Sequence, residues 1–164
     1  CKTINVVRRK ELISELKDLG ADEVVLDGDN LDEKVNEATN GSKIRFALDA
    51  LAGDAPVRLA KCLVYGGVVF NYGLVSKKPC QMPTWLMLNR DIRLQGFFAG
   101  TQLLEKSLEG KKALIAELGE IIGKGDMPSK IAKTYPLTKI KEALVHASSS
   151  GSERDGKIIL LPNT

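Results

Sequence analysis

The sequence predicts an α/β fold, a doubly wound parallel sheet with helices over both faces. Short apolar runs alternate with amphipathic helical patterns roughly every 20 to 25 residues, as in successive βαβ units. Gly, Asn and Asp separate these segments. The chain has 164 residues, of which 43% are hydrophobic and 27% charged, so it can bury one sizeable core.

The first half of the chain has the clearest alternation. Leu12, Leu16 and Leu19 recur at helical spacing, and Gly20 then supplies a left-handed stop. Gly53 and Asp54 precede the third helical pattern, where Asp54 is a candidate N-cap. Strands are expected at 3–7, 23–26, 44–50 and 66–73, and helices at 10–19, 31–39 and 55–64.

The second half continues with longer loops. The most periodic helical pattern of the chain covers 111–123 and ends at Gly123 and Gly125. We expect loops at 74–83 and 148–155, helices at 84–89, 111–123 and 139–147, and strands at 92–99 and 157–161. The C-terminal tail begins at 135–137, to which we assign no element.

Composition excludes several classes of function. A net charge of +3 with interspersed signs and 5% aromatic residues argues against a nucleic-acid partner. The apolar runs are too short to span a membrane, and no signal-peptide core is visible. With Cys1, Cys62, Cys80 and His146 as the only cysteines and histidine, neither a disulfide framework nor a zinc cluster is expected. These observations predict a soluble, cytoplasmic, metal-free protein.

Three cations follow the first predicted strand. Open parallel sheets bind ligands at the carboxyl ends of their strands, which is where Arg8, Arg9 and Lys10 stand. Guanidinium groups bind phosphate bidentately, and cations oppose the dipole of a helix N-terminus, so phosphate binding is one interpretation. The other is a solvated start to the helix.

Two later strands end in residues that could border a flat ligand. Gly73, directly after Tyr72, allows close approach of the backbone, although glycine there could equally form a tight turn. Phe97 and Phe98 end the strand at 92–99, where aromatic residues are more usually part of a core.

Catalytic motifs are absent from the sequence. GxGxxG, GxSxG, the P-loop and HExxH do not occur, and His146, Cys62 and Cys80 lack the neighbours of a base or nucleophile. On the residues alone, we interpret His146 as a surface or packing residue and both cysteines as structural or incidental.

Taken in order, eight segments resemble the medium-chain dehydrogenase/reductase superfamily, and in particular its zinc-free NADPH-dependent 2-enoyl thioester reductases. They include Ala47-Leu48-Asp49-Ala50, Tyr72-Gly73 and Gly156-Lys157-Ile158. The complete set is 3–8, 16–24, 47–53, 66–73, 94–98, 135–137, 142–143 and 156–158. Arg9, where these reductases often carry an acid, and Leu74, in place of a second glycine, depart from the pattern.

The resemblance implies a Rossmann-like fold that binds NADP(H). It places Arg8, Arg9 and Lys10 at the adenosine 2′-phosphate and gives Lys157 a contact with the cofactor. The residues it places beside the nicotinamide are Tyr72, Gly73, Leu74, Val75, Phe97, Phe98 and Ala99.

The resemblance also implies a fragment of a two-domain reductase. Residues 1–134 would form the nucleotide-binding domain without its first strand and glycine turn, and 135–164 would return to a GroES-like catalytic domain outside the chain. We expect the isolated chain to be inactive.

The implied activity is reduction of the C=C bond of 2-enoyl thioesters in fatty acid synthesis. An NADPH:quinone reductase, or a non-catalytic nucleotide-binding or dimerisation paralogue, remains an alternative. The implied partner is a second copy, paired through strand 92–99, and the location is the mitochondrial matrix if the protein is eukaryotic.

Overall fold

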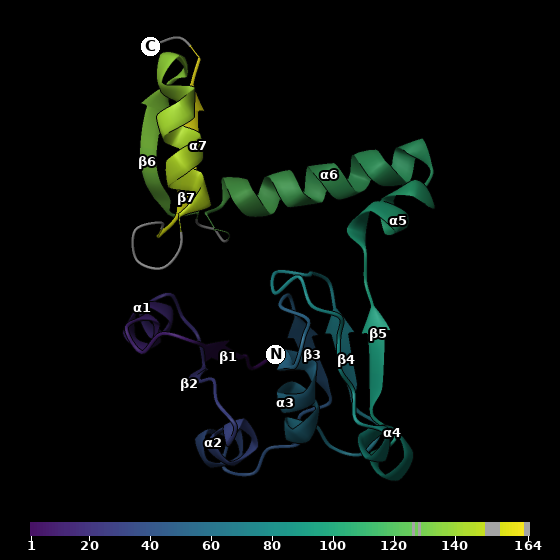
Figure 1. Ribbon diagram of the computed structural model, residues 1–164. Coiled ribbons are helices and arrows are strands. Elements are labelled where there is room, and N and C mark those ends of the chain that lie inside the picture. Colours follow the sequence, from purple (N-terminus) through teal and green to yellow (C-terminus); the bar gives the residue numbers. More distant parts are fainter. Residues whose placement is uncertain (126, 128, 150–154, 163–164) are drawn as a thin grey trace. The chain divides into compact units, whose positions relative to one another are not determined.

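The computed structural model describes residues 1–125, 127, 129–149 and 155–162 (Figure 1). These residues form two compact units, Cys1–Thr101 and Gln102–Thr164. Unit 1 alternates strands and helices. Its elements are β1 (Ile4–Val7), α1 (Leu12–Asp18), β2 (Glu23–Leu26), α2 (Leu31–Ala38), β3 (Phe46–Asp49), α3 (Ala55–Cys62), β4 (Val68–Asn71), α4 (Thr84–Arg90), β5 (Arg93–Gly96) and the start of α5 (Ala99–Leu104).

All strand pairs of unit 1 are parallel, as expected for an α/β fold. β1 pairs with β2, with Ile4 opposite Glu23. β3, β4 and β5 form a separate three-stranded sheet in that order. Within the fully described residues 1–101, β1 and β3 therefore each have one edge without a strand partner.

The β1–β2 pair is covered on both faces. Val24 and Val25 point to opposite faces because side chains alternate along a strand, yet both are buried. α1 and α2 lie on either side of this pair (Figure 1). Leu31 and Val35 of α2 pack with Val25 in one apolar cluster.

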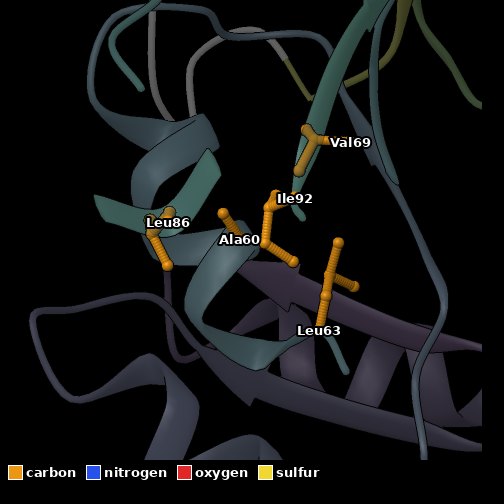
Figure 2. Close-up of a cluster of buried hydrophobic side chains, with 5 residues drawn as sticks. All are labelled: Ala60, Leu63, Val69, Leu86 and Ile92. Carbon is orange, nitrogen blue, oxygen red and sulfur yellow. The ribbon is translucent and has the colours of Figure 1, made fainter. Parts of the chain in front are cut away.

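The main core of unit 1 lies between the β3–β5 sheet and the helices α3 and α4. Figure 2 shows its five central side chains pointing toward one another. They are Ala60 and Leu63 from α3 and its end, Val69 from β4, Leu86 from α4, and Ile92 just before β5. Each fully buried aliphatic side chain of this size contributes about 1.5 to 3 kcal/mol, so this cluster holds the sheet to its helices.

The other face of β3 is open. Phe46 and Leu48 alternate with Ala47 and Asp49 along the strand, and they are 64% and 72% exposed. The Phe46 ring lies 6.1 Å from that of Phe70 on β4. One apolar face of this sheet thus remains uncovered within unit 1.

Unit 2 is smaller and is built around one parallel strand pair. β6 (Ile131–Pro136) pairs with β7 (Lys157–Leu161), and α7 (Ile140–Ser148) packs against both. α6 (Leu108–Gly123) begins at Ser107, whose hydroxyl accepts a hydrogen bond from the Gly110 N–H. The turn η1 (Leu137–Lys139) connects β6 to α7.

Several predicted elements need correction. Residues 131–136 form a strand that the sequence analysis did not predict. The strand predicted at 92–99 ends at Gly96, because Ala99 already begins α5. Asp54 stands at the N-cap of α3 but caps no N–H, because its carboxylate pairs with Arg58 at 2.9 Å. Most of the loop predicted at 148–155 lies outside the described residues.

In the described part of the chain, no helix is long and apolar enough to cross a membrane.

Candidate functional site

The candidate site lies where the strands of unit 1 end. Arg8, Arg9 and Lys10 directly follow β1, and α1 begins only at Leu12, so the cations lie in the preceding turn. Arg8 and Lys10 are exposed and Arg9 is half-buried. Among the residues that the structure describes, no carboxylate forms an ion pair with Arg8 or Lys10. Both cations are therefore available to an anionic ligand.

A neighbouring carboxylate is already engaged. Asp27 follows β2, and its N–H donates to the Val7 carbonyl at 2.8 Å, which places it beside the end of β1. Its two carboxylate oxygens accept hydrogen bonds from Arg58 Nε and Nη2 at 2.8 and 2.9 Å. Hydrogen bonding to Asp27 is the main reason that the pKa of Arg58 is raised. Asp27 thus has a bidentate cationic partner of its own.

The segments after β3 and β4 run side by side. The Tyr72 N–H donates to Asp49 O at 2.9 Å, and the N–H groups of Val75 and Ser76 donate to Ala50 O and Leu51 O at 3.1 and 2.9 Å. Gly73 lies within this contact, because a Cβ there would stand 2.6 Å from Ala50 O. Glycine at 73 therefore serves close approach of two backbones, whereas Gly66, with φ +75°, serves a turn.

The predicted nicotinamide residues lie on these exposed ends. Tyr72, Leu74, Val75, Phe97 and Phe98 all have exposed side chains. Phe97 is tied to β4, since its N–H donates to Asn71 O at 2.8 Å. Neither phenylalanine is part of a core in unit 1, contrary to the usual role of aromatics in strands. Lys157 belongs to unit 2, where its N–H donates to Lys130 O at 2.8 Å.

A cavity of about 920 Å³ lies between β1 and β3, and we call it the β1–β3 cavity. It brings together Arg8 and Tyr72 from the predicted set. Its strand part is mostly apolar, with Asn5 of β1 as a polar exception, and further polar groups lie before β1 and at the carboxyl ends of the strands. The main lining residues are Ile4, Val6, Phe46, Leu48 and Phe70 along the strands, and Arg8, Asp27, Asp49, Ala50, Leu51 and Tyr72 at their carboxyl ends.

Sequence reasoning missed Asp49, which is 2% exposed. Its signal was available, since a carboxylate at the end of an apolar strand must find buried donors. Cys62 also lines the cavity, but burial raises the pKa of its thiol to about 11, which agrees with a structural role.

An α/β unit of parallel strands, with cations and a cavity at their carboxyl ends, has the architecture of nucleotide-binding proteins. Comparison with known proteins narrows this class. The family model described as zinc-binding dehydrogenase matches residues 1–117. The chain therefore belongs to this family, within the medium-chain dehydrogenase/reductase superfamily.

The chain is also similar to individual proteins of known sequence or structure. A mitochondrial enoyl-[acyl-carrier-protein] reductase of Caenorhabditis elegans is 34% identical over 131 residues, which are 77% of this chain and 37% of that protein. An NADPH:quinone reductase structure from Bacillus thuringiensis has a TM-score of 0.85 at 24% identity, over 98% of this chain and 49% of its own. The complex of Etr1p with NADP and crotonyl-CoA has a TM-score of 0.74 at 22% identity, over 97% and 46%.

The chain thus spans less than half the length of each of these proteins. The structural likenesses, being under 25% identical, establish the Rossmann-like fold alone. Despite the family's description, the described residues contain no group of three or more His, Cys, Asp or Glu side chains that could hold a metal ion.

Proposed function

We propose that this chain forms the cofactor-binding part of an NADPH-dependent oxidoreductase that reduces the C=C bond of 2-enoyl thioesters. The observation that carries the proposal is Arg8, which lines the β1–β3 cavity and has no carboxylate partner among the described residues. The curated relatives are named enoyl-[acyl-carrier-protein] reductases, which supports the substrate class.

The residues present fit NADP(H). An arginine at the end of this strand accommodates a 2′-phosphate, whereas NAD binding would favour a free acid. Asp27, which follows the neighbouring strand β2, is held by Arg58 and does not offset Arg8. We propose that Arg8, Arg9 and Lys10 hold the 2′-phosphate. The residues proposed to border the nicotinamide are Tyr72, Gly73, Leu74, Val75, Phe97, Phe98 and Ala99, with Lys157 as a further contact.

When bound, NADPH supplies a hydride to the β-carbon of the enoyl thioester, and a proton must reach the α-carbon. We do not propose any of the cofactor-binding side chains as the donor of that proton. We propose that the proton donor belongs to a GroES-like domain outside this chain, so the isolated chain is expected to give no turnover.

The open edges of β1 and β3 support the same division. The edge strands β1 and β3 both line the β1–β3 cavity, and we propose that one further parallel strand pairs with both of them. We propose that residues 1–134 form the nucleotide-binding domain without this strand and its glycine turn, and that 135–164 return to the catalytic domain.

A quinone reductase is the second candidate. The structure of an NADPH:quinone reductase has a TM-score of 0.85, against 0.74 for Etr1p with NADP and crotonyl-CoA. Two assays of the intact protein with NADPH separate the two activities. One measures the turnover of crotonyl-CoA and the other measures the turnover of a benzoquinone. Because curated relatives are mitochondrial enzymes, the proposed location in a eukaryote is the mitochondrial matrix.

The cofactor proposal is tested with the double substitution Arg8→Ala/Arg9→Ala in the intact protein. Each charge-assisted contact contributes on the order of 1.5 to 3 kcal/mol, so the Kd for NADPH should rise at least about tenfold per lost contact. The Kd for NADH should barely change, because NADH has no 2′-phosphate. Fluorescence titration with each cofactor measures both values.

A matched control removes two cations from the amino-terminal end of a strand, away from the proposed phosphate site. Lys43 and Arg45 are exposed and precede β3, so Lys43→Ala/Arg45→Ala changes the net charge equally without touching the carboxyl ends. This variant should bind NADPH as wild type does. Equal losses for NADPH and NADH in the Arg8/Arg9 variant, or no loss at all, would reject 2′-phosphate binding.

A further inference from the structure

The carboxylate of Asp49 is buried at the end of β3 and is held by three donors. Its Oδ1 accepts from the Leu51 N–H at 2.9 Å, and its Oδ2 from the Ala52 N–H at 2.9 Å and from Asn71 Nδ2 at 2.7 Å. A buried carboxylate needs such donors because burial without them is costly. Here the donors come from two different segments of the chain, the loop after β3 and the end of β4.

Asn71, at the end of β4, connects the carboxyl ends of β3, β4 and β5. Asn71 stands opposite Asp49 in the β3–β4 register and opposite Gly96 in the β4–β5 register. Its side-chain amide also donates to Gly73 O at 2.9 Å, and its own carbonyl accepts from the Phe97 N–H at 2.8 Å. The Asp49 and Asn71 side chains therefore join the segments beginning at Ala50 and Tyr72, and the backbone carbonyl of Asn71 ties the segment beginning at Phe97 to the same strand end.

The loop after β3 adopts a backbone conformation that needs this support. Ala52 has φ +63°, in the left-handed region that disfavours residues with a Cβ, and it is almost completely buried. Such conformations persist where the surroundings over-determine them, and they cluster at ligand sites. The hydrogen bond from its N–H to Asp49 supplies one such constraint.

We infer that Asp49 is a positioning residue that, through Asn71, sets the geometry of the loops receiving the nicotinamide half of the cofactor. This inference rests on the proposed function, since it takes Tyr72 to Val75 and Phe97 to Ala99 as the nicotinamide border. The chemistry assigned to Asp49 is that of an acceptor for three N–H donors. Its action on the ligand is indirect, through the backbone of 50–53 and 72–75.

The test is the substitution Asp49→Asn in the intact protein, with two probes. NADPH carries the nicotinamide, whereas adenosine 2′,5′-bisphosphate carries only the half proposed to bind at Arg8. Asparagine has the same shape, but its NH₂ group must face a donor. Loss of charge-assisted hydrogen bonds should raise the Kd for NADPH at least about tenfold. The Kd for adenosine 2′,5′-bisphosphate should stay within about twofold of wild type, because Arg8 is untouched.

Two further variants distinguish positioning from general destabilisation. Asn71→Ser keeps the Leu51 and Ala52 bonds to Asp49 but removes the amide bonds from residue 71 to Asp49 and to Gly73, so it should show the same selective loss in a milder form. Leu86→Ala weakens the core without touching these loops, and at a temperature where it is folded it should bind both probes normally.

The outcomes separate the two proposals. Selective loss of NADPH in Asp49→Asn and Asn71→Ser supports the inference. Unchanged NADPH binding in both variants, or equal weakening of both probes, overturns it while leaving the proposed cofactor intact. Failure of the wild-type protein to bind either probe would overturn the proposed function and the inference together.

Discussion

Arg8 and Asp27 follow neighbouring parallel strands, but their surroundings differ. Arg8 is exposed at the β1–β3 cavity, whereas the Asp27 carboxylate is held by Nε and Nη2 of Arg58 in a half-buried pair. Arg58 also pairs with Asp54 at 2.9 Å, and this neighbouring charge lowers the pKa of Asp54. Arg58 thus balances Asp27 and Asp54, and Arg8 brings a positive charge to the β1–β3 cavity.

The reactivity of the Cys62 thiol, which lines the cavity, can be measured by alkylation. Burial raises the pKa of this thiol to about 11 from an ordinary 9.0, so at pH 8 its thiolate fraction is about a hundredfold lower. We expect iodoacetamide to modify the exposed Cys1 much faster than Cys62 in the native chain, with both reacting readily in urea. Peptide mass spectrometry measures the two rates. Equal native rates would contradict the buried thiol.

The raised pKa of Cys62 should make the folded protein less stable as the pH rises into the alkaline range. The folded-state pKa of Cys62 lies above the unfolded value, so its contribution to stability is complete below about pH 9. The contribution is lost as the pH rises through about 11. Cys62→Ser should therefore flatten the alkaline part of a denaturation-midpoint profile.

The sequence alone predicted where some residues of the candidate site lie in the fold. The cations after β1 and the glycine after Tyr72 could be found from strand order, because the carboxyl ends of parallel strands share one edge. The Arg58 partner of Asp27, 31 positions along the chain, could not. Neither could the Asp49–Asn71 contact, which depends on the β3–β4 register.

At the scale of elements, periodicity predicted the helices and strands that have their own apolar pattern. β2 and β7 have the predicted bounds, and α3 lacks only its last two predicted residues. β6 was missed because most of its side chains are exposed, and it exists through pairing with β7, which comes about 20 residues later. α5 was missed because it is short and follows directly on a strand.

Substitution of two leucines on α4 measures how much the core beneath the β3–β5 sheet contributes to stability. Leu86 is 0% exposed and Leu88, one half-turn away, is 77% exposed. Leu86→Ala should lower the free energy of unfolding by about 2 to 5 kcal/mol, since it leaves a cavity among tightly packed side chains. Leu88→Ala should change it by less than about 0.5 kcal/mol. Urea denaturation followed by circular dichroism measures both, and equal effects would mean that the Figure 2 cluster does not stabilise the unit.

At the scale of the whole molecule, the outer edge of β5 matters most for assembly. β5 pairs with β4 alone within unit 1. The N–H groups of Arg93 and Phe97 donate to Gly67 O and Asn71 O, toward β4. Because N–H directions alternate along a strand, those of Leu94 and Gly96 point to the outer edge. An unpaired edge of this kind invites a strand from a second copy.

We therefore expect a homodimer in which the β5 strands of two copies pair about a two-fold axis. Leu94→Pro removes an outward N–H without removing a β4–β5 hydrogen bond, so the intact protein should shift toward monomer in sedimentation velocity. Gly96→Pro provides a second variant that loses no core side chain, because a Cβ at Gly96 meets nothing within 4 Å. Arg45→Ala, before β3, should leave the sedimentation coefficient unchanged. If both proline variants sediment as the wild-type dimer while remaining folded, the interface lies elsewhere.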